Sequence, residues 1–183
     1  ILNSMAMIAS SLFVQWWQVV VCGLSSQRRL KTASLYRIQI FKLLKIRIDT
    51  ENQKLELLDE SRLVRRYPVF TAINGVGEVS GSFCTPRGRH VVRARIGAGL
   101  PENTVFVRRR PSGEVYTDEL GSQFPERDWI LSRILWLSGC EPGFNRLGKV
   151  DTMRRYIYIH GTPHEDAIGR PASHGCIRMR MRD

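Results

Sequence analysis

The sequence predicts a mainly β domain over residues 44–183, preceded by an apolar and then basic segment at residues 1–43. Two features carry this prediction: from Lys45 onward apolar residues recur in short alternating runs, and stretches rich in glycine or proline separate these runs. With 183 residues, of which 43% are hydrophobic, the chain can bury a core and lacks the composition of a disordered protein. We therefore expect one domain of ordinary size with a terminal extension.

The strands of this domain are predicted in chain order. A hairpin comes first, at residues 44–60 (LKIRIDTENQKLELLDE), where apolar and charged residues alternate on both sides of a turn at Asp49–Asn52. Further strands are predicted at Val69–Ile73 and Val91–Ile96, and one helix around Trp129–Leu137. Several short strands joined by turns are typical of a β-rich domain.

The N-terminal segment contains an uncharged apolar stretch, Met5–Leu24, which is about long enough to span a bilayer. Three basic residues follow it within residues 28–31. A cleavable signal peptide carries its positive charge before the apolar run, whereas the order found here fits an anchor with a cytoplasmic basic flank. Three interpretations stay open: a membrane anchor, a buried helix around Trp16 and Trp17, and a stretch outside the translated protein.

The chain is strongly basic, with 28 Lys and Arg against 17 Asp and Glu and a net charge of +11. Such an excess favours a polyanionic partner or surface. The basic residues are scattered, with Arg108–Arg110 as the densest run, and neither a zinc-finger spacing nor an RNA-binding aromatic signature accompanies them. We therefore expect a solvated face or an anionic envelope polymer as partner, and no nucleic acid.

The cysteines suggest neither a metal site nor an obligatory disulfide. The chain has four of them, widely separated and without a CxxC pair: Cys22, Cys84, Cys140 and Cys176. Cys84 and Cys140 could be bridged in an oxidising compartment, or could be free buried thiols. The histidines near the C-terminus, His160, His164 and His174, match no common zinc spacing with Cys176, so no metal is expected.

The last thirty residues carry the strongest functional signal. The strand pattern at Tyr156–Ile159 puts Tyr158 and His160 on one face, and His160 is expected at the strand end, where a loop begins. Cys176 follows sixteen positions later, in the run Ser173-His174-Gly175-Cys176. A loop that returns to a neighbouring strand would bring the imidazole and the thiol together.

A cysteine beside an imidazole is the minimum for thiolate attack, because a nearby base lowers the pKa of the thiol and activates it. Gly175 lacks a Cβ, so successive backbone N–H groups near it can point at one spot, as an oxyanion hole requires. By spacing alone, an ordinary buried thiol with a surface imidazole stays open as the alternative.

This stretch resembles the signature of the L,D-transpeptidase catalytic domain, the YkuD-like family: a histidine, a loop, Ser/Thr-His-Gly-Cys and, two places on, Asn or Arg. The matching residues are His160, the run Ser173–Cys176, and Arg178. Upstream, Thr85-Pro86-Arg87-Gly88 resembles the TPxG turn of the family, and residues 139–145 and 156–161 resemble its run into the catalytic histidine. The loop before Cys176 is at the short end for the family, resembling the Gram-negative envelope enzymes, and the domain is expected to stop before its last helix or strand.

The resemblance implies a β-sandwich with a few short helices and a role for each motif residue. Cys176 is the nucleophile, His160 the general base, and the carbonyl of Gly161 orients the imidazole. The backbone amides of His174, Gly175 and Cys176 stabilise the oxyanion.

The roles of four neighbouring side chains each have two open interpretations. His174 and Ser173 either brace the motif loop or contact substrate. Arg178 either grips a substrate carboxylate or is a surface arginine, and Tyr158 either walls the cleft or packs in the core.

The activity implied is peptidoglycan L,D-transpeptidation in the periplasm or facing the cell wall. The thiolate attacks the carbonyl between the third residue and the terminal D-alanine of a tetrapeptide stem, and the amine of a second stem resolves the acyl-enzyme. An L,D-carboxypeptidase and a protein-to-peptidoglycan transferase use the same intermediate, and a non-catalytic peptidoglycan-binding module is the remaining alternative. Carbapenems are expected inhibitors, and no cofactor is required.

Overall fold

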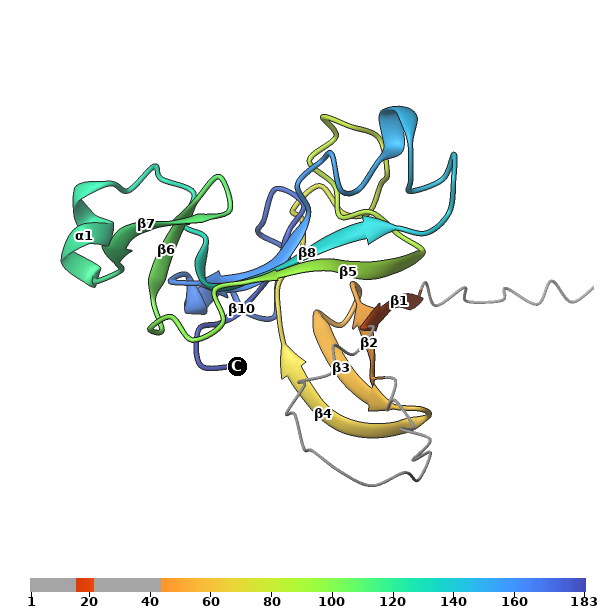
Figure 1. Cartoon of the computed structure of the whole chain (residues 1–183), viewed down its shortest axis with the longest axis horizontal. Coiled ribbons are helices and arrows are strands. Elements are labelled where there is room, and N and C mark those ends of the chain that lie inside the picture. The colour runs from red at the N-terminus through yellow and green to blue at the C-terminus, as the bar shows by residue number, and fades with distance from the viewer. Residues whose placement is uncertain (1–15, 22–43) are drawn as a thin grey trace, which may run out of the picture.

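The computed structural model describes residues 16–21 and 44–183 of the chain. Within these residues the protein is mainly β, which confirms the predicted fold class (Figure 1). The strands are β1 (Trp16–Val21), β2 (Leu44–Asp49), β3 (Lys54–Asp59), β4 (Arg62–Pro68), β5 (Arg89–Ile96), β6 (Thr104–Val107), β7 (Arg110–Val115), β8 (Leu131–Gly139), β9 (Tyr158–Thr162) and β10 (Ile177–Arg180). The helices are short: α1 (Asp118–Gln123) and the 3-10 turns Gly148–Val150 and Glu165–Ala167.

The strands form one strongly curved sheet in the order β10-β9-β8-β5-β1-β2-β3-β4. The pairs β1–β5 and β9–β10 are parallel, and the other neighbours along this path are antiparallel. The β6–β7 hairpin lies off the path and joins it through one pairing between β6 and β8. In Figure 1 this hairpin and α1 lie at the end of the molecule opposite β2–β4.

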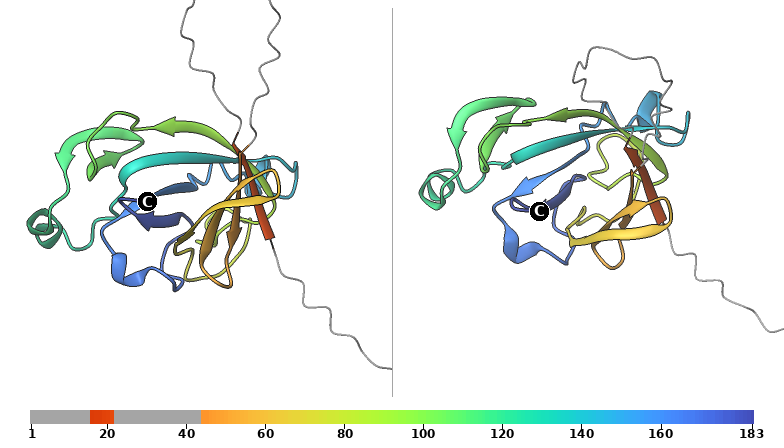
Figure 2. Two further views of the ribbon diagram at one scale, coloured as in Figure 1. Left: turned by 90° about the horizontal axis from the view of Figure 1, so that it is seen from below. Right: turned by 60° about the horizontal axis from the view of Figure 1, so that its bottom comes forward.

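The curvature of the sheet brings its two ends together around a hydrophobic core. Ile46, Ile48 and Leu55 from β2 and β3 pack with Leu137 of β8 and with the β9–β10 segment in one buried cluster. Figure 2 shows β2–β4 folded back beside the C-terminal strands. Apolar burial of this kind is the main favourable contribution to folding, so the sandwich arrangement follows from the alternating pattern of the strands.

The first hairpin forms where the sequence predicts it. Ile46 pairs with Leu57 and Ile48 with Leu55, so the apolar side chains of β2 and β3 share a face. Asp49 fixes the turn, because its Oδ1 accepts the backbone N–H of Asn52 at 2.9 Å.

The alternation predicted around β9 is confirmed. Ile157 and Ile159 belong to the main core, whereas Tyr158 packs on the other side with Phe106 and Ile134. The strand itself spans Tyr158–Thr162, so His160 lies inside it and the loop begins later than predicted. The face that carries Tyr158 and His160 is the one that Cys176 joins.

Two predicted elements differ from the structure. Residues 131–139 form strand β8, so the helix expected around Trp129–Leu137 is wrong. Its apolar residues fit a helical period, but they also fit a strand that is buried on both faces. The segment forms a strand because it pairs with β5 on one side and with β9 on the other. Val69–Ile73 is an extended segment with isolated bridges, Phe70 to Arg178 and Ala72 to Ser173, and not a regular strand.

The interpretations of residues 1–43 fall mostly outside the described residues. Trp16–Val21 lie inside them and form β1, between β2 and β5, so these six residues are not part of a helix. Across residues 16–21 and 44–183, no helix is long and apolar enough to cross a membrane.

Candidate active site

Parallel pairing of β9 with β10 brings the motif histidine and cysteine together. Arg178 is the register partner of His160, and Ile177 is the partner of Ile159. Cys176, just before β10, therefore lies opposite Tyr158, whose backbone N–H points at its Sγ with N and S 3.4 Å apart. Because side chains two positions apart on a strand share a face, the thiol and the imidazole lie on the same side of this strand pair.

The imidazole of His160 is held in one orientation. Its Nδ1 lies 2.8 Å from the carbonyl oxygen of Gly161, and since a carbonyl only accepts, Nδ1 carries the proton. Nε2 is buried and has no hydrogen-bond partner among the described residues. Burial, and after it the positive charge of Arg178, lowers the pKa of His160 to about 4. At neutral pH the ring is therefore uncharged, with a free lone pair on Nε2.

Cys176 is a thiol at rest. Burial raises its pKa to about 11, and the Tyr158 N–H and the charge of Arg178 offset only part of that effect. This differs from the expectation that the neighbouring base lowers the pKa of the thiol in the resting protein. The physical reason is that His160 is itself uncharged, so it supplies no cation to stabilise a thiolate.

The loop before Cys176 is fixed by buried hydroxyls. Ser173 Oγ donates to the carbonyl of Cys176 at 2.6 Å and accepts the N–H of Gly175 at 3.2 Å. Thr85 Oγ1 donates to the carbonyl of Gly175 at 3.0 Å and accepts the N–H of Ala72 at 2.9 Å. Ser173 is fully buried, and both of these hydrogen bonds stay within the motif loop.

Gly175 is required for this loop but does not serve as a free amide donor. Its φ is +128°, and a Cβ at this position would lie 3.0 Å from Ile157 Cδ1. Of the three amides predicted as oxyanion donors, the N–H of Gly175 donates to Ser173 Oγ at 3.2 Å in this structure. Within the described part of the chain, the amides of His174 and Cys176 have no acceptor.

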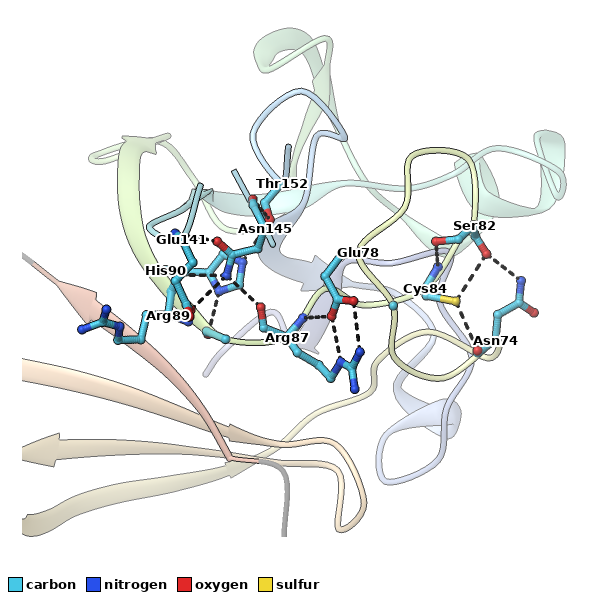
Figure 3. Close-up of polar contacts among 12 residues, drawn as sticks. Asn74, Glu78, Ser82, Cys84, Arg87, Arg89, His90, Glu141, Asn145 and Thr152 are labelled. Atoms are coloured by element: carbon cyan, nitrogen blue, oxygen red, sulfur yellow. Dashed lines mark hydrogen bonds and ion pairs between the residues drawn. The ribbon is translucent and has the colours of Figure 1, made fainter. Parts of the chain in front are cut away.

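The TPxG-like turn, residues 85–88, is anchored from behind by the stretch 139–145. Asn145 Nδ2 donates to the carbonyls of Arg87 at 2.8 Å and Arg89 at 3.2 Å, as Figure 3 shows. Glu141 Oε1 accepts the N–H of Arg89 at 2.6 Å. A Cβ on Gly88, whose φ is +87°, would lie only 2.5 Å from that oxygen. The two upstream stretches that resemble the family are thus one contact network.

Cys84 and Cys140 are free thiols, so the possible bridge between them is not formed. The carbonyl of Cys84 instead accepts a hydrogen bond from Arg155 at 2.5 Å, and the same guanidinium donates to the carbonyls of Gly77 and Glu78 at 2.9 and 2.8 Å. Arg155 therefore fixes the loop that contains Gly77, Glu78 and Cys84, on one side of the candidate site.

A cavity of about 670 Å³ opens over Cys176 and is lined by Tyr158, His174 and Arg178, among others. Tyr158 is a buried wall of this cavity, and its hydroxyl accepts from Arg109 at 3.4 Å. His174 is exposed and packs edge to face on Phe83, with ring centroids 6.0 Å apart. Its ring contact is therefore with Phe83, which lines the same cavity.

Arg178 is not a surface arginine. Its side chain is 7% exposed, one nitrogen donates to Asp128 at 2.5 Å, and Nε is buried without a partner. Asp128 is the residue that the sequence did not reveal, since a lone aspartate fifty positions away carries no local signal. Its carboxylate is 62% exposed at the rim of the cavity.

Across the described residues no group of three or more metal-ligating side chains occurs. The arrangement consists instead of a thiol, a neutral imidazole with a free nitrogen, two open amides and a partly satisfied guanidinium. These are the parts that acyl transfer through a covalent intermediate uses.

Comparisons with known proteins identify the family of the chain. Residues 44–183 match the family YkuD, described as the L,D-transpeptidase catalytic domain. Among solved structures, an L,D-transpeptidase from Mycobacterium smegmatis is similar at 15% identity with a TM-score of 0.32, over 72% of this chain and 46% of its own. No curated protein matches the chain. Since the family match covers most of the sequence, the chain belongs to the L,D-transpeptidase catalytic domain family.

Proposed function

We propose that this protein is a peptidoglycan L,D-transpeptidase that works through a cysteine acyl-enzyme, with Cys176 as nucleophile and His160 as general base. The observation that carries the proposal is the β9–β10 pairing, which sets a thiol beside an imidazole whose Nε2 has no partner. Membership of the family supports the reaction class.

In the first half-reaction, Cys176 Sγ attacks the carbonyl carbon that joins the third residue of a tetrapeptide stem to its terminal D-alanine. The thiol proton passes to His160 Nε2 as the S–C bond forms, because both groups are neutral beforehand. The tetrahedral intermediate then breaks its C–N bond. The departing D-alanine amine takes the proton from the imidazolium, and a thioester remains.

In the second half-reaction, the amine of a second stem peptide attacks the thioester carbonyl and passes its proton to His160. The C–S bond breaks, an amide cross-link forms, and the sulfur regains the proton from the imidazolium. Water in place of the amine would release a tripeptide, which is the carboxypeptidase outcome.

The surrounding groups assist both steps. The amides of His174 and Cys176 are the proposed oxyanion donors. The carbonyl of Gly161 keeps the proton of His160 on Nδ1, so Nε2 is the nitrogen that accepts the thiol proton. Arg178 is proposed to bind an oxygen of the substrate through its unpartnered Nε. Because the substrate is peptidoglycan, we place the protein in the cell envelope, in the periplasm or facing the wall.

The test is incubation with a tetrapeptide stem donor, with and without a second stem peptide as amine acceptor. Intact-mass spectra of the protein report the thioester, and chromatography of the peptides reports dimer or tripeptide. We expect a thioester in wild type and a cross-linked dimer when the acceptor is present.

Cys176→Ser is the matched control and should give neither thioester nor product, because a hydroxyl is far less ionised than a thiol. Tripeptide without dimer at saturating acceptor would replace transpeptidase by carboxypeptidase. A protein that binds the stem and never forms a thioester would overturn the enzymatic proposal and leave a binding module.

A further inference from the structure

The cavity above Cys176 is strongly cationic. Five arginines and one acidic residue line it: Arg108, Arg109, Arg154, Arg155, Arg178 and Asp128. Cationic walls around a concave site concentrate the positive potential and attract anionic ligands. The positive charge of this lining does not follow simply from the net charge of the chain, because most of the basic residues lie outside the cavity.

Two of these arginines are used inside the protein. Arg155 donates to the carbonyls of Gly77, Glu78 and Cys84 through its two terminal nitrogens. Arg109 lies over the ring of Trp136 at 4.6 Å and over that of Tyr156 at 4.9 Å. These contacts hold the tip of the β6–β7 hairpin beside the cavity and leave other guanidiniums to face a ligand.

Arg108 and Arg154 are not used in this way. Both are exposed, and within residues 16–21 and 44–183 neither guanidinium donates a hydrogen bond or forms an ion pair. Asp151 attracts Arg154 electrostatically, but its carboxylate oxygens accept the backbone N–H groups of Leu147 and Arg154 itself. Arg108 comes from the hairpin tip and Arg154 from the segment before β9.

Arg178 adds an unsatisfied donor deeper in the same cavity. Its side chain is 93% buried, Asp128 takes one terminal nitrogen, and Nε–H has no acceptor. A buried donor without a partner is costly, so an acceptor oxygen of a ligand is favoured at this position. The cavity therefore offers one buried and two exposed guanidinium positions to oxygens of an anion.

We propose that the site selects donor stem peptides whose carboxylates are free over stems in which those carboxylates are amidated, and that Arg108 and Arg154 are the selecting residues. A guanidinium binds a carboxylate with charge-assisted and often bidentate hydrogen bonds, whereas a carboxamide brings no charge and its NH₂ faces the guanidinium N–H groups unfavourably. The inference rests on the proposed function and specifies its substrate.

The experiment compares two synthetic tetrapeptide donors that share a diamino acid, a terminal D-alanine and a free terminal carboxylate. In one the remaining carboxyl groups are free, and in the other they are carboxamides. The rate of thioester formation on Cys176 is followed by intact mass. We expect wild type to prefer the free form about tenfold or more, the scale of one charge-assisted contact. Raising the salt from about 0.05 M to about 0.5 M should shrink the preference by screening.

Arg108→Gln and Arg154→Gln should each reduce the preference, and the double variant should abolish it while the amidated donor still reacts. Arg110→Gln and Arg146→Gln remove the same charge from exposed residues that do not line the cavity, and should keep the preference. Equal rates for both donors in wild type, or equal losses in the control variants, would overturn this inference and leave the proposed function standing. No thioester with either donor would overturn both.

Discussion

At the residue scale, burial favours the uncharged forms of His160 and Cys176, the two groups proposed to react. His160 has its pKa lowered to about 4 and Cys176 has its pKa raised to about 11. These shifts disfavour a thiolate–imidazolium pair in the resting protein, so in the proposed reaction charge develops as the substrate carbonyl is attacked. Arg178 lowers both pKa values and Asp128 raises both, so this ion pair adjusts the site without contacting the sulfur.

The first prediction concerns alkylation of Cys176 by iodoacetamide in the absence of substrate. Because the thiolate is the reactive form, the rate should be low at neutral pH and should rise towards about pH 11. Asp128→Asn should move the rise to lower pH, since the negative charge that raises the pKa of the thiol is lost. A rate that levels off near pH 7 in wild type would show that a thiolate exists at rest.

The second prediction separates His160 from His174, which is closer to Cys176 in sequence. His160→Ala removes the Nε2 acceptor and should slow acylation by about 10²-fold or more, the usual scale for a general base. His174→Ala removes a side chain that packs on Phe83 and should have a much smaller effect. Acylation rates across pH decide the point, and a larger loss in His174→Ala would transfer the role of base to that residue.

At the scale of elements, local pattern predicts hairpins and fails where long-range pairing decides. The β2–β3 hairpin was predictable because its alternation and its Asp49 turn are contiguous. Strand β8 was not predictable, because its apolar run fits both a helical and a strand period. Only its pairing with β5 and β9 makes it a strand. The hydrogen bond from the N–H of Gly175 to Ser173 Oγ likewise depends on loop geometry that the motif does not encode.

The third prediction tests the network behind the TPxG-like turn. Gly88→Ala places a Cβ 2.5 Å from Glu141 Oε1 at a φ of +87°, so both strain and a clash oppose it. Gly99→Ala is the matched control, because its φ is +78° and nothing lies within 4 Å of the added Cβ. We expect about 1 kcal/mol of destabilisation for Gly99→Ala and clearly more for Gly88→Ala in urea unfolding. Equal losses of stability in the two variants would mean that the contacts around Gly88 rearrange to accept the Cβ without destabilising the fold.

At the scale of the whole molecule, the cavity draws its charges from segments that only the fold assembles. Arg108 belongs to the β6–β7 tip, Asp128 to the segment before β8, Arg154 to the segment before β9, and Arg178 to β10. The sequence revealed a basic chain and a Cys–His motif. Which arginines face the thiol, and which acid pairs with Arg178, depends on contacts between residues tens of positions apart.

The fourth prediction is that acid destabilises the fold through two buried histidines. Burial lowers the pKa of His90 and of His160 from 6.5 to about 4. Between these values the unfolded chain binds more protons than the folded one, so the free energy of unfolding falls as pH drops from about 6.5 to 4. The full loss is roughly 3 kcal/mol per histidine. Urea titrations across this window should be flatter in His90→Gln than in His174→Gln, and identical slopes would contradict the account.

In the proposed reaction Cys176 is the group that is acylated. Incubation with a carbapenem, followed by intact mass and peptide mapping, tests it directly, because the strained carbonyl forms a stable adduct whose oxyanion fits the same amides. The account predicts one adduct, on the peptide that contains Cys176, absent from Cys176→Ser and slowed in His160→Ala. An adduct on Cys84 or Cys140, or an adduct unchanged in Cys176→Ser, would contradict it.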